Sequence, residues 1–126
     1  MLYALDTDPQ TNIVVAGETN DPSIHPYGIG ANFYPLIVFV EASTFNLNRW
    51  VKTYDTANFY VKRVQFNPSG DRIAALLSYR TVQTLDDSRV YTMNSRDGSS
   101  INHHFIQINS MDFYHYDLKM MLHYDS

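Results

Sequence analysis

Apolar and polar residues alternate most clearly around one short turn in the middle of the chain. Val64 and Phe66 alternate with polar residues before the turn, and residues 73–77 form an apolar run after it. The turn itself, residues 67–71, contains a proline that presets φ, Asn and Asp side chains that hydrogen-bond to nearby backbone, and a glycine that accepts positive φ. This pattern predicts a β-hairpin.

The start of the chain has a similar pattern over residues 2–17, and setting Pro9 on Pro68 aligns the two stretches at an offset of 59 residues. A weaker third copy begins at Ile106, 42 residues after Val64, without the proline and glycine. Residues 19–35 are rich in Pro, Gly and Asn, and removing these 17 residues from the first offset also leaves 42. We therefore interpret residues 19–35 as a long loop inserted into the first unit.

Two further segments, residues 36–54 and 89–108, each read as strand, loop, strand, and the second contains the turn dipeptide Asp97-Gly98. The predicted fold class is all-β, with antiparallel four-stranded blade-like sheets that form a partial β-propeller or an assembly of blades. One domain spans residues 1–126, with unit 1 at 2–60, unit 2 at 61–105 and a degenerate tail at 106–126. In the tail, the alternation over residues 114–120 favours a strand. A short helix presenting one aromatic and apolar face is the alternative, with Phe113, Tyr116, Met120 and Tyr124 on that face.

The residues from Phe66 to Ala74 resemble the F-x-P-x-G-x-x-I-A turn of WD-repeat-like β-propellers. Residues 90–94, together with Asp97-Gly98-Ser99, resemble the strand and turn that follow in the divergent, Tol-type blades. The chain has no Trp-Asp dipeptide and no Gly-His pair, so the resemblance is to divergent blades. It covers about two repeats, whereas propellers typically close with four or more. The resemblance therefore leaves three outcomes: the chain associates with itself, it docks onto another protein chain that completes the sheet or propeller, or it is part of a longer polypeptide. We predict self-association or a partner chain.

Charge and composition exclude several classes of function. The net charge is −4 with no block of basic residues, which argues against nucleic acid as a partner. No apolar run is long enough to span a bilayer, so membrane insertion is not expected. The absence of cysteine excludes disulfides, thiolate metal sites and cysteine nucleophiles. The compartment stays undetermined, with a cytoplasmic location slightly favoured.

Candidate chemical motifs favour structural roles, and we predict no catalytic residue, no metal site and no cofactor. Asp6 and Asp8 are spaced like the start of a calcium loop, but the glycine and distal Glu of that loop are absent. His103 and His104 point to opposite faces if they lie on a strand, and His115 and His123 are eight residues apart. Asp86-Asp87 lies in an ordinary polar connection.

Aromatic residues are the strongest candidates for binding, because the chain has ten Tyr, seven Phe and one Trp. Such side chains are favoured at protein interfaces and also stack on sugars. The candidate binding residues lie in the inserted loop and around the segment after residue 48: Tyr27, Phe33, Tyr34, Trp50 and Tyr54. Packing between sheets is the alternative role for them.

The sequence thus predicts a non-catalytic structural or scaffold protein that mediates protein–protein assembly through propeller-like blades. The alternative is a fragment of a ligand-binding or hydrolytic propeller, with a sugar or small-molecule site carried by the loop at 19–35. Loss of assembly on loop deletion separates the first hypothesis from the second, which predicts saturable ligand binding that disappears with the loop.

Overall fold

The computed structural model describes residues 1–24, 32–41, 46–79 and 88–106. Within these ranges the chain is all-β and contains no helix. The strands are β1 (Leu2–Thr7), β2 (Ile13–Thr19), β3 (Tyr34–Glu41), β4 (Asn46–Thr53), β5 (Phe59–Phe66), β6 (Arg72–Tyr79), β7 (Ser88–Asn94) and β8 (Ser100–Ile106). They form two four-stranded antiparallel sheets, ordered β1-β2-β3-β4 and β5-β6-β7-β8, so within each sheet every strand pairs with its neighbours along the chain. The predicted all-β class with antiparallel four-stranded, blade-like sheets is confirmed.

The central hairpin is formed by β5 and β6, as the sequence predicts. Its turn is closed by a hydrogen bond from the Gly70 N–H to the Asn67 carbonyl oxygen at 3.0 Å, and Gly70 has a φ of 80°. The Asn67 side chain fixes both ends of the turn, because its Oδ1 accepts a hydrogen bond from the Arg72 N–H at 3.0 Å and its Nδ2 donates to Asp71 Oδ1 at 2.6 Å. Turn chemistry in the sequence therefore sets this reversal.

The hairpin of β1 and β2 has a turn of the same kind. The Thr11 N–H donates to the Asp8 carbonyl oxygen at 3.0 Å, and Asp8 Oδ1 accepts from the Asn12 N–H at 2.8 Å. Thr11 has a φ of 64°, which is uncommon for a β-branched residue. The alignment of Pro9 with Pro68 places Thr11 at the position of Gly70, so both turns use the left-handed region at the same point.

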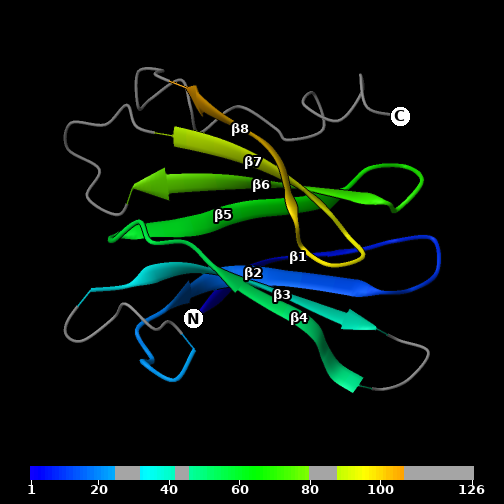
Figure 1. Cartoon of the computed structure of the whole chain (residues 1–126), viewed down its shortest axis with the longest axis horizontal. Coiled ribbons are helices and arrows are strands. Elements are labelled where there is room, and N and C mark those ends of the chain that lie inside the picture. Colours follow the sequence, from blue (N-terminus) through cyan, green and yellow to red (C-terminus); the bar gives the residue numbers. More distant parts are fainter. Residues whose placement is uncertain (25–31, 42–45, 80–87, 107–126) are drawn as a thin grey trace.

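The two sheets pack face to face around a shared apolar core, and β5 lies against β1, β2 and β3 of the first sheet. Figure 1 shows β5 beside the blue strands of the first sheet, with β6, β7 and β8 following in order away from it. The buried core residues of the first sheet are Val14, Ala16, Ile37 and Phe39; those of the second are Phe59, Val61, Val64, Phe66, Ile73, Ala75, Leu77 and Met93. We call the side of the first sheet that carries Val14 and Phe39 its inner face.

Polar contacts also join the two sheets. The Phe66 N–H, at the end of β5, donates a 2.8 Å hydrogen bond to Asp6 Oδ2 at the end of β1. The two turns touch, because a Cβ added to Gly70 would lie 3.1 Å from the Asp8 Cβ. The Asn58 N–H donates to the Phe33 carbonyl oxygen at 2.8 Å just before β5. These bonds tie equivalent ends of the two sheets to each other.

The predicted insertion at 19–35 connects β2 to β3, but Thr19 belongs to β2, and Tyr34 and Pro35 belong to β3. The Asp97-Gly98 turn lies between β7 and β8 as predicted, with a Gly98 φ of 74°. The predicted strand at 114–120, its helical alternative and the Asp86-Asp87 pair lie outside the described residues. The part of the chain that the structure describes contains no helix long and apolar enough to cross a membrane.

Candidate functional site

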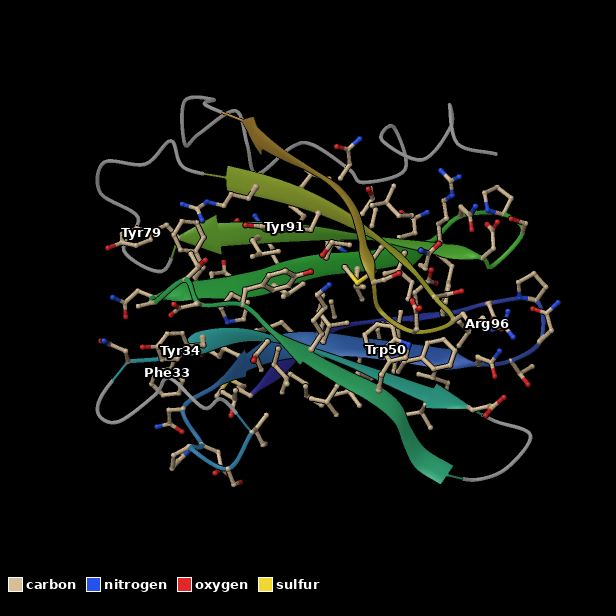
Figure 2. The ribbon with its side chains drawn as sticks, viewed as in Figure 1. Phe33, Tyr34, Trp50, Tyr79, Tyr91 and Arg96 are labelled. Carbon is tan, nitrogen blue, oxygen red and sulfur yellow. The ribbon has the colours of Figure 1, made fainter. Side chains whose placement is uncertain are left out.

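Trp50 lies on the inner face of the first sheet, where it contacts the second sheet (Figure 2). Its ring stacks on Phe39 with centroids 5.6 Å apart, and its indole Nε1 donates a 2.8 Å hydrogen bond to the Ser95 carbonyl oxygen. The ring also covers Gly98, where an added Cβ would lie 3.0 Å from ring carbons. Trp50 therefore packs between the sheets, in the role the sequence left as the alternative to ligand binding.

Tyr54, just after β4, makes similar contacts. Its ring stacks on Tyr91 of the second sheet with centroids 4.5 Å apart, and the Lys52 Nζ lies 5.3 Å from the same ring centroid. Burial raises the pKa of the Tyr54 phenol because it disfavours the phenolate, and the neighbouring Tyr91 raises it further. Among the residues that the structure describes, the buried Tyr54 hydroxyl has no hydrogen-bond partner.

The Lys52 side chain extends from β4 of the first sheet to the second sheet. Its Nζ donates hydrogen bonds to the Gly98 carbonyl oxygen at 2.5 Å and to Ser100 Oγ at 2.8 Å. Desolvation lowers the pKa of Lys52, and the Asp97 carboxylate nearby acts in the opposite direction. Since the ammonium already donates to backbone and hydroxyl oxygens, Lys52 links β4 to the turn between β7 and β8.

Phe33 and Tyr34 lie at the opposite end of the sheets from Trp50 (Figure 2). Tyr34 is buried at the start of β3, and Phe33, half-buried, precedes it. Tyr27 lies outside the described residues. The structure therefore brings Trp50 and Tyr54 to one side of the first sheet and keeps Phe33 and Tyr34 apart from Trp50, so these four candidates do not form one surface.

The two aspartates with calcium-like spacing serve separate purposes in the structure. Asp8 is buried and its carboxylate accepts hydrogen bonds from the turn it begins, whereas Asp6 accepts the Phe66 N–H. Among the described residues, no group of three or more His, Asp or Glu side chains could hold a metal ion. His103 and His104 lie in β8, while His115 and His123 fall outside the described part.

Glu18 is a buried carboxylate that the sequence analysis did not single out. It is 2 % exposed in β2, and its Oε1 accepts a 2.6 Å hydrogen bond from the Tyr3 hydroxyl. The Tyr3 ring in turn packs against Tyr60 of β5, with centroids 5.1 Å apart. Glu18 thus helps to hold β1 in place beside the second sheet.

The outer face of the first sheet is the side that points away from the second sheet, and its residues are largely apolar. Leu5 pairs with Val15, Val15 with Val38, and Val38 with Val51, so one row of apolar residues crosses all four strands. Leu5 is 63 % exposed and Val51 is 44 % exposed, at the two edges of the row. We define the outer face by its accessible apolar residues: Leu2, Leu5, Ile13, Val15, Val38, Val40 and Val51.

Cross-strand pairing shows how continuous this face is. Ile13 pairs with Val40 on one side of the central row, and Leu36 pairs with Gly17 and with Thr53 on the other. Because side chains alternate along a strand, these rows lie on the same side of the sheet as Val15 and Val38. None of the residues whose pairing is described in these rows is charged. The arrangement is suited to packing against another apolar surface.

The sequence contains a signal for this surface. Residues 13–16 and 36–40 are apolar at every position, which is typical of strands covered on both faces. Only one face of β2 and β3 is covered by the second sheet. The apolar runs predict strands, but they do not say which face of each strand the second sheet leaves uncovered. No protein-family model matches the chain, and a search of curated proteins found no match.

Proposed function

We propose that this chain is a non-catalytic structural protein that assembles with protein chains through its blade-like sheets. The resemblance of residues 61–100 to WD-repeat-like, Tol-type blades supports this proposal. So does the arrangement of the sheets, because consecutive four-stranded antiparallel sheets that pack face to face are the building units of propellers. Two such units leave sheet faces for further units to cover.

The observation that carries the proposal is the apolar outer face of the first sheet, where Leu5 and Val51 are exposed and which the second sheet does not cover. Fully burying one Val or Leu side chain contributes about 1.5–3 kcal/mol, so covering Leu5 and Val51 favours association. Contiguous apolar patches on a folded protein mark interaction sites more often than isolated apolar residues do. The inner face already shows that this sheet packs well against another sheet.

The aromatic contacts support an assembly role over a ligand-binding role. Trp50 and Tyr54 stack on Phe39 and Tyr91, so their ring faces are occupied within the chain. A sugar would need such a ring face to be accessible for stacking.

Light scattering on the purified chain, combined with size-exclusion chromatography, tests the proposal. We expect a mass above that of one chain at micromolar concentration, and a shift toward the single chain on dilution. A mass equal to one chain at every concentration up to the high micromolar range would contradict the proposal.

A further inference from the structure

We infer that residues 107–126, the C-terminal segment, pack on the far side of the second sheet and withhold that side from assembly. The far side is the one opposite the first sheet, and we define it by the described residues that project from it: Arg63, Gln65, Arg72, Ala74, Leu76, Ser78, Val90 and Thr92. The contact lies within one chain and stands independently of the proposed function. Its effect on assembly rests on that function.

The far side is buried, although the first sheet lies against the opposite side. Leu76 is 4 % exposed and Val90 is 1 % exposed. The core residues that face the first sheet, among them Ile73 and Leu77, alternate along β6 with the residues of the far side. The first sheet therefore does not cover Leu76 and Val90, and another part of the chain must do so.

The first sheet shows how accessible such residues are on an open side. By the alignment of the two turns, the pair Val15 and Val38 of the first sheet corresponds to the pair Ala74 and Thr92 of the second. Val15 and Val38 are half-buried on the outer face, whereas Ala74 and Thr92 are buried. Equivalent positions thus differ in burial, which indicates a cover on the second sheet that the outer face lacks.

Chain length identifies the segment that can provide this cover. Residues 25–31 and 42–45 connect strands of the first sheet. Residues 80–87 connect β6 to β7, and a connection of this length reaches about four residue lengths, roughly 14 Å, before it must return. Ala74 lies six residues before that connection, roughly 20 Å along the strand. Residues 107–126 are the remaining segment, and they are long enough.

The C-terminal segment also starts next to the far side. It follows Ile106 of β8, which pairs with Ser88 at the start of β7. Four strands span about 14 Å across the sheet, because neighbouring strands lie about 4.8 Å apart. The 20 residues of the segment would reach roughly 66 Å if fully extended. The segment can therefore cross the whole sheet.

The chemistry of the segment suits the far side. The sequence gives it an apolar face both as a strand and as a helix, and Tyr116 and Met120 belong to that face in both cases. On the far side Arg63 is exposed and Arg72 is half-buried, and none of the described residues that define this side is acidic. The segment contains three aspartates and one lysine, so its net charge is opposite to that of the far side.

The first experiment measures how fast a water-soluble thiol reagent modifies the full chain with Thr92→Cys, since the chain has no other cysteine. Val38→Cys, at the equivalent position on the outer face, is the matched control, and Ile101→Cys on β8 is a 39 % exposed reference. We expect Thr92→Cys to react about tenfold more slowly than Val38→Cys or slower still, because the thiol is covered.

Substitutions in the C-terminal segment then show whether it provides the cover. Adding Met120→Lys to Thr92→Cys should raise the rate toward that of Val38→Cys, because a lysine at the contact would have to bury its charge. His115 lies off the apolar face of both the strand and the helix, so adding His115→Lys should leave the rate unchanged. Circular dichroism, and an unchanged rate for Val38→Cys with Met120→Lys, check that the fold is retained.

A crosslinking experiment tests the contact without adding a charge. Thr92→Cys combined with Tyr116→Cys or Met120→Cys is treated with a short thiol-to-thiol crosslinker, and Val38→Cys with the same partners is the control. We expect a link within one chain for one or both of the Thr92→Cys pairs, well above the control. Fast modification of Thr92→Cys in the chain with its own C-terminal segment would overturn the inference. Slow modification that Met120→Lys does not change, with no crosslink above the control, would also overturn it.

Light scattering tests the effect of the contact on assembly. Uncovering the far side gives the chain a second accessible apolar side, so we expect a larger mass for Met120→Lys than for His115→Lys at the same concentration. Equal masses above one chain would overturn this effect. A mass of one chain for every variant would overturn the proposed function, while the thiol reactions would still decide whether the C-terminal segment covers the far side.

Discussion

The indole nitrogen of Trp50 donates a 2.8 Å hydrogen bond to the Ser95 carbonyl oxygen, joining β4 of the first sheet to the segment after β7. This bond links residues 45 positions apart and lies beside the stacking of Trp50 on Phe39. It explains how the outermost strand of the first sheet is held against the second sheet, with which it shares no strand pairing.

Trp50→Phe tests the weight of this bond. The ring stacking on Phe39 is retained in part, but the Ser95 carbonyl loses its donor and some packing volume is lost. We expect the free energy of unfolding to fall by about 1–3 kcal/mol, measured by urea denaturation with circular dichroism. A fall below about 0.5 kcal/mol would show that this hydrogen bond and its ring contacts contribute little to stability.

Asp6 allows a comparison of two substitutions at the contact between β1 and β5. Asp6→Ala leaves the Phe66 N–H without its acceptor, and we expect a loss of about 1–3 kcal/mol. Asp6→Asn keeps an oxygen in the same place and should lose clearly less. Chemical denaturation of both variants measures the difference. Equal losses in the two variants would mean that the hydrogen bond to Phe66 is not what Asp6 contributes.

Thr11 and Gly70 provide opposite tests of the two corresponding turns. Gly70→Ala places a Cβ at a φ of 80° and 3.1 Å from the Asp8 Cβ, and we expect it to destabilise the chain by about 1–2 kcal/mol. Thr11→Gly relieves a β-branched residue at a φ of 64°, and should be neutral or stabilising by up to about 1 kcal/mol. Thermal and urea unfolding measure both. Destabilisation by Thr11→Gly comparable to that by Gly70→Ala would contradict the account of the turns.

The pKa of Tyr54 predicts how stability depends on pH in the alkaline range. Tyrosine in an unfolded chain has a pKa of about 10, and burial raises the pKa of Tyr54 in the fold. The folded state therefore holds this proton more tightly, so the corresponding stability is complete below about pH 10 and is lost as the pH rises above that value. Tyr54→Phe removes this loss, and we expect its free energy of unfolding to fall less steeply with pH than that of the unsubstituted chain.

Near neutral pH, Tyr54→Phe should leave stability unchanged or slightly raised, because the hydroxyl that it removes is buried without a hydrogen-bond partner among the described residues. Urea denaturation at neutral pH and at about pH 10.5 checks both parts of this prediction. Parallel losses of stability with pH in the variant and the unsubstituted chain would show that Tyr54 is not the group responsible.

Local signals account for what the sequence predicted correctly. Pro68, Gly70 and Asp97-Gly98 fix turns through their own backbone preferences, and the apolar segments between turns become strands. Within each sheet, the strand order follows because each strand pairs with the next along the chain. These features depend on short stretches of sequence, which can be read without knowing the fold.

The roles of Trp50, Tyr54 and the outer face depend on register and could not be read in the same way. Trp50 points inward because it pairs with Phe39, and Val51 points outward because it pairs with Val38. A slip of one residue would exchange these two faces. Residues 13–16 are apolar on both faces of the strand that they form. The sequence alone therefore does not say which of these faces packs against the second sheet.

Sedimentation of the unsubstituted chain beside Val51→Lys and Ile101→Lys tests the central claim most directly. We expect the unsubstituted chain and Ile101→Lys to sediment with more than the mass of one chain at micromolar concentration, and Val51→Lys to sediment closer to the mass of a single chain. Equal behaviour of Val51→Lys and Ile101→Lys, at any mass, would contradict assembly through the outer face.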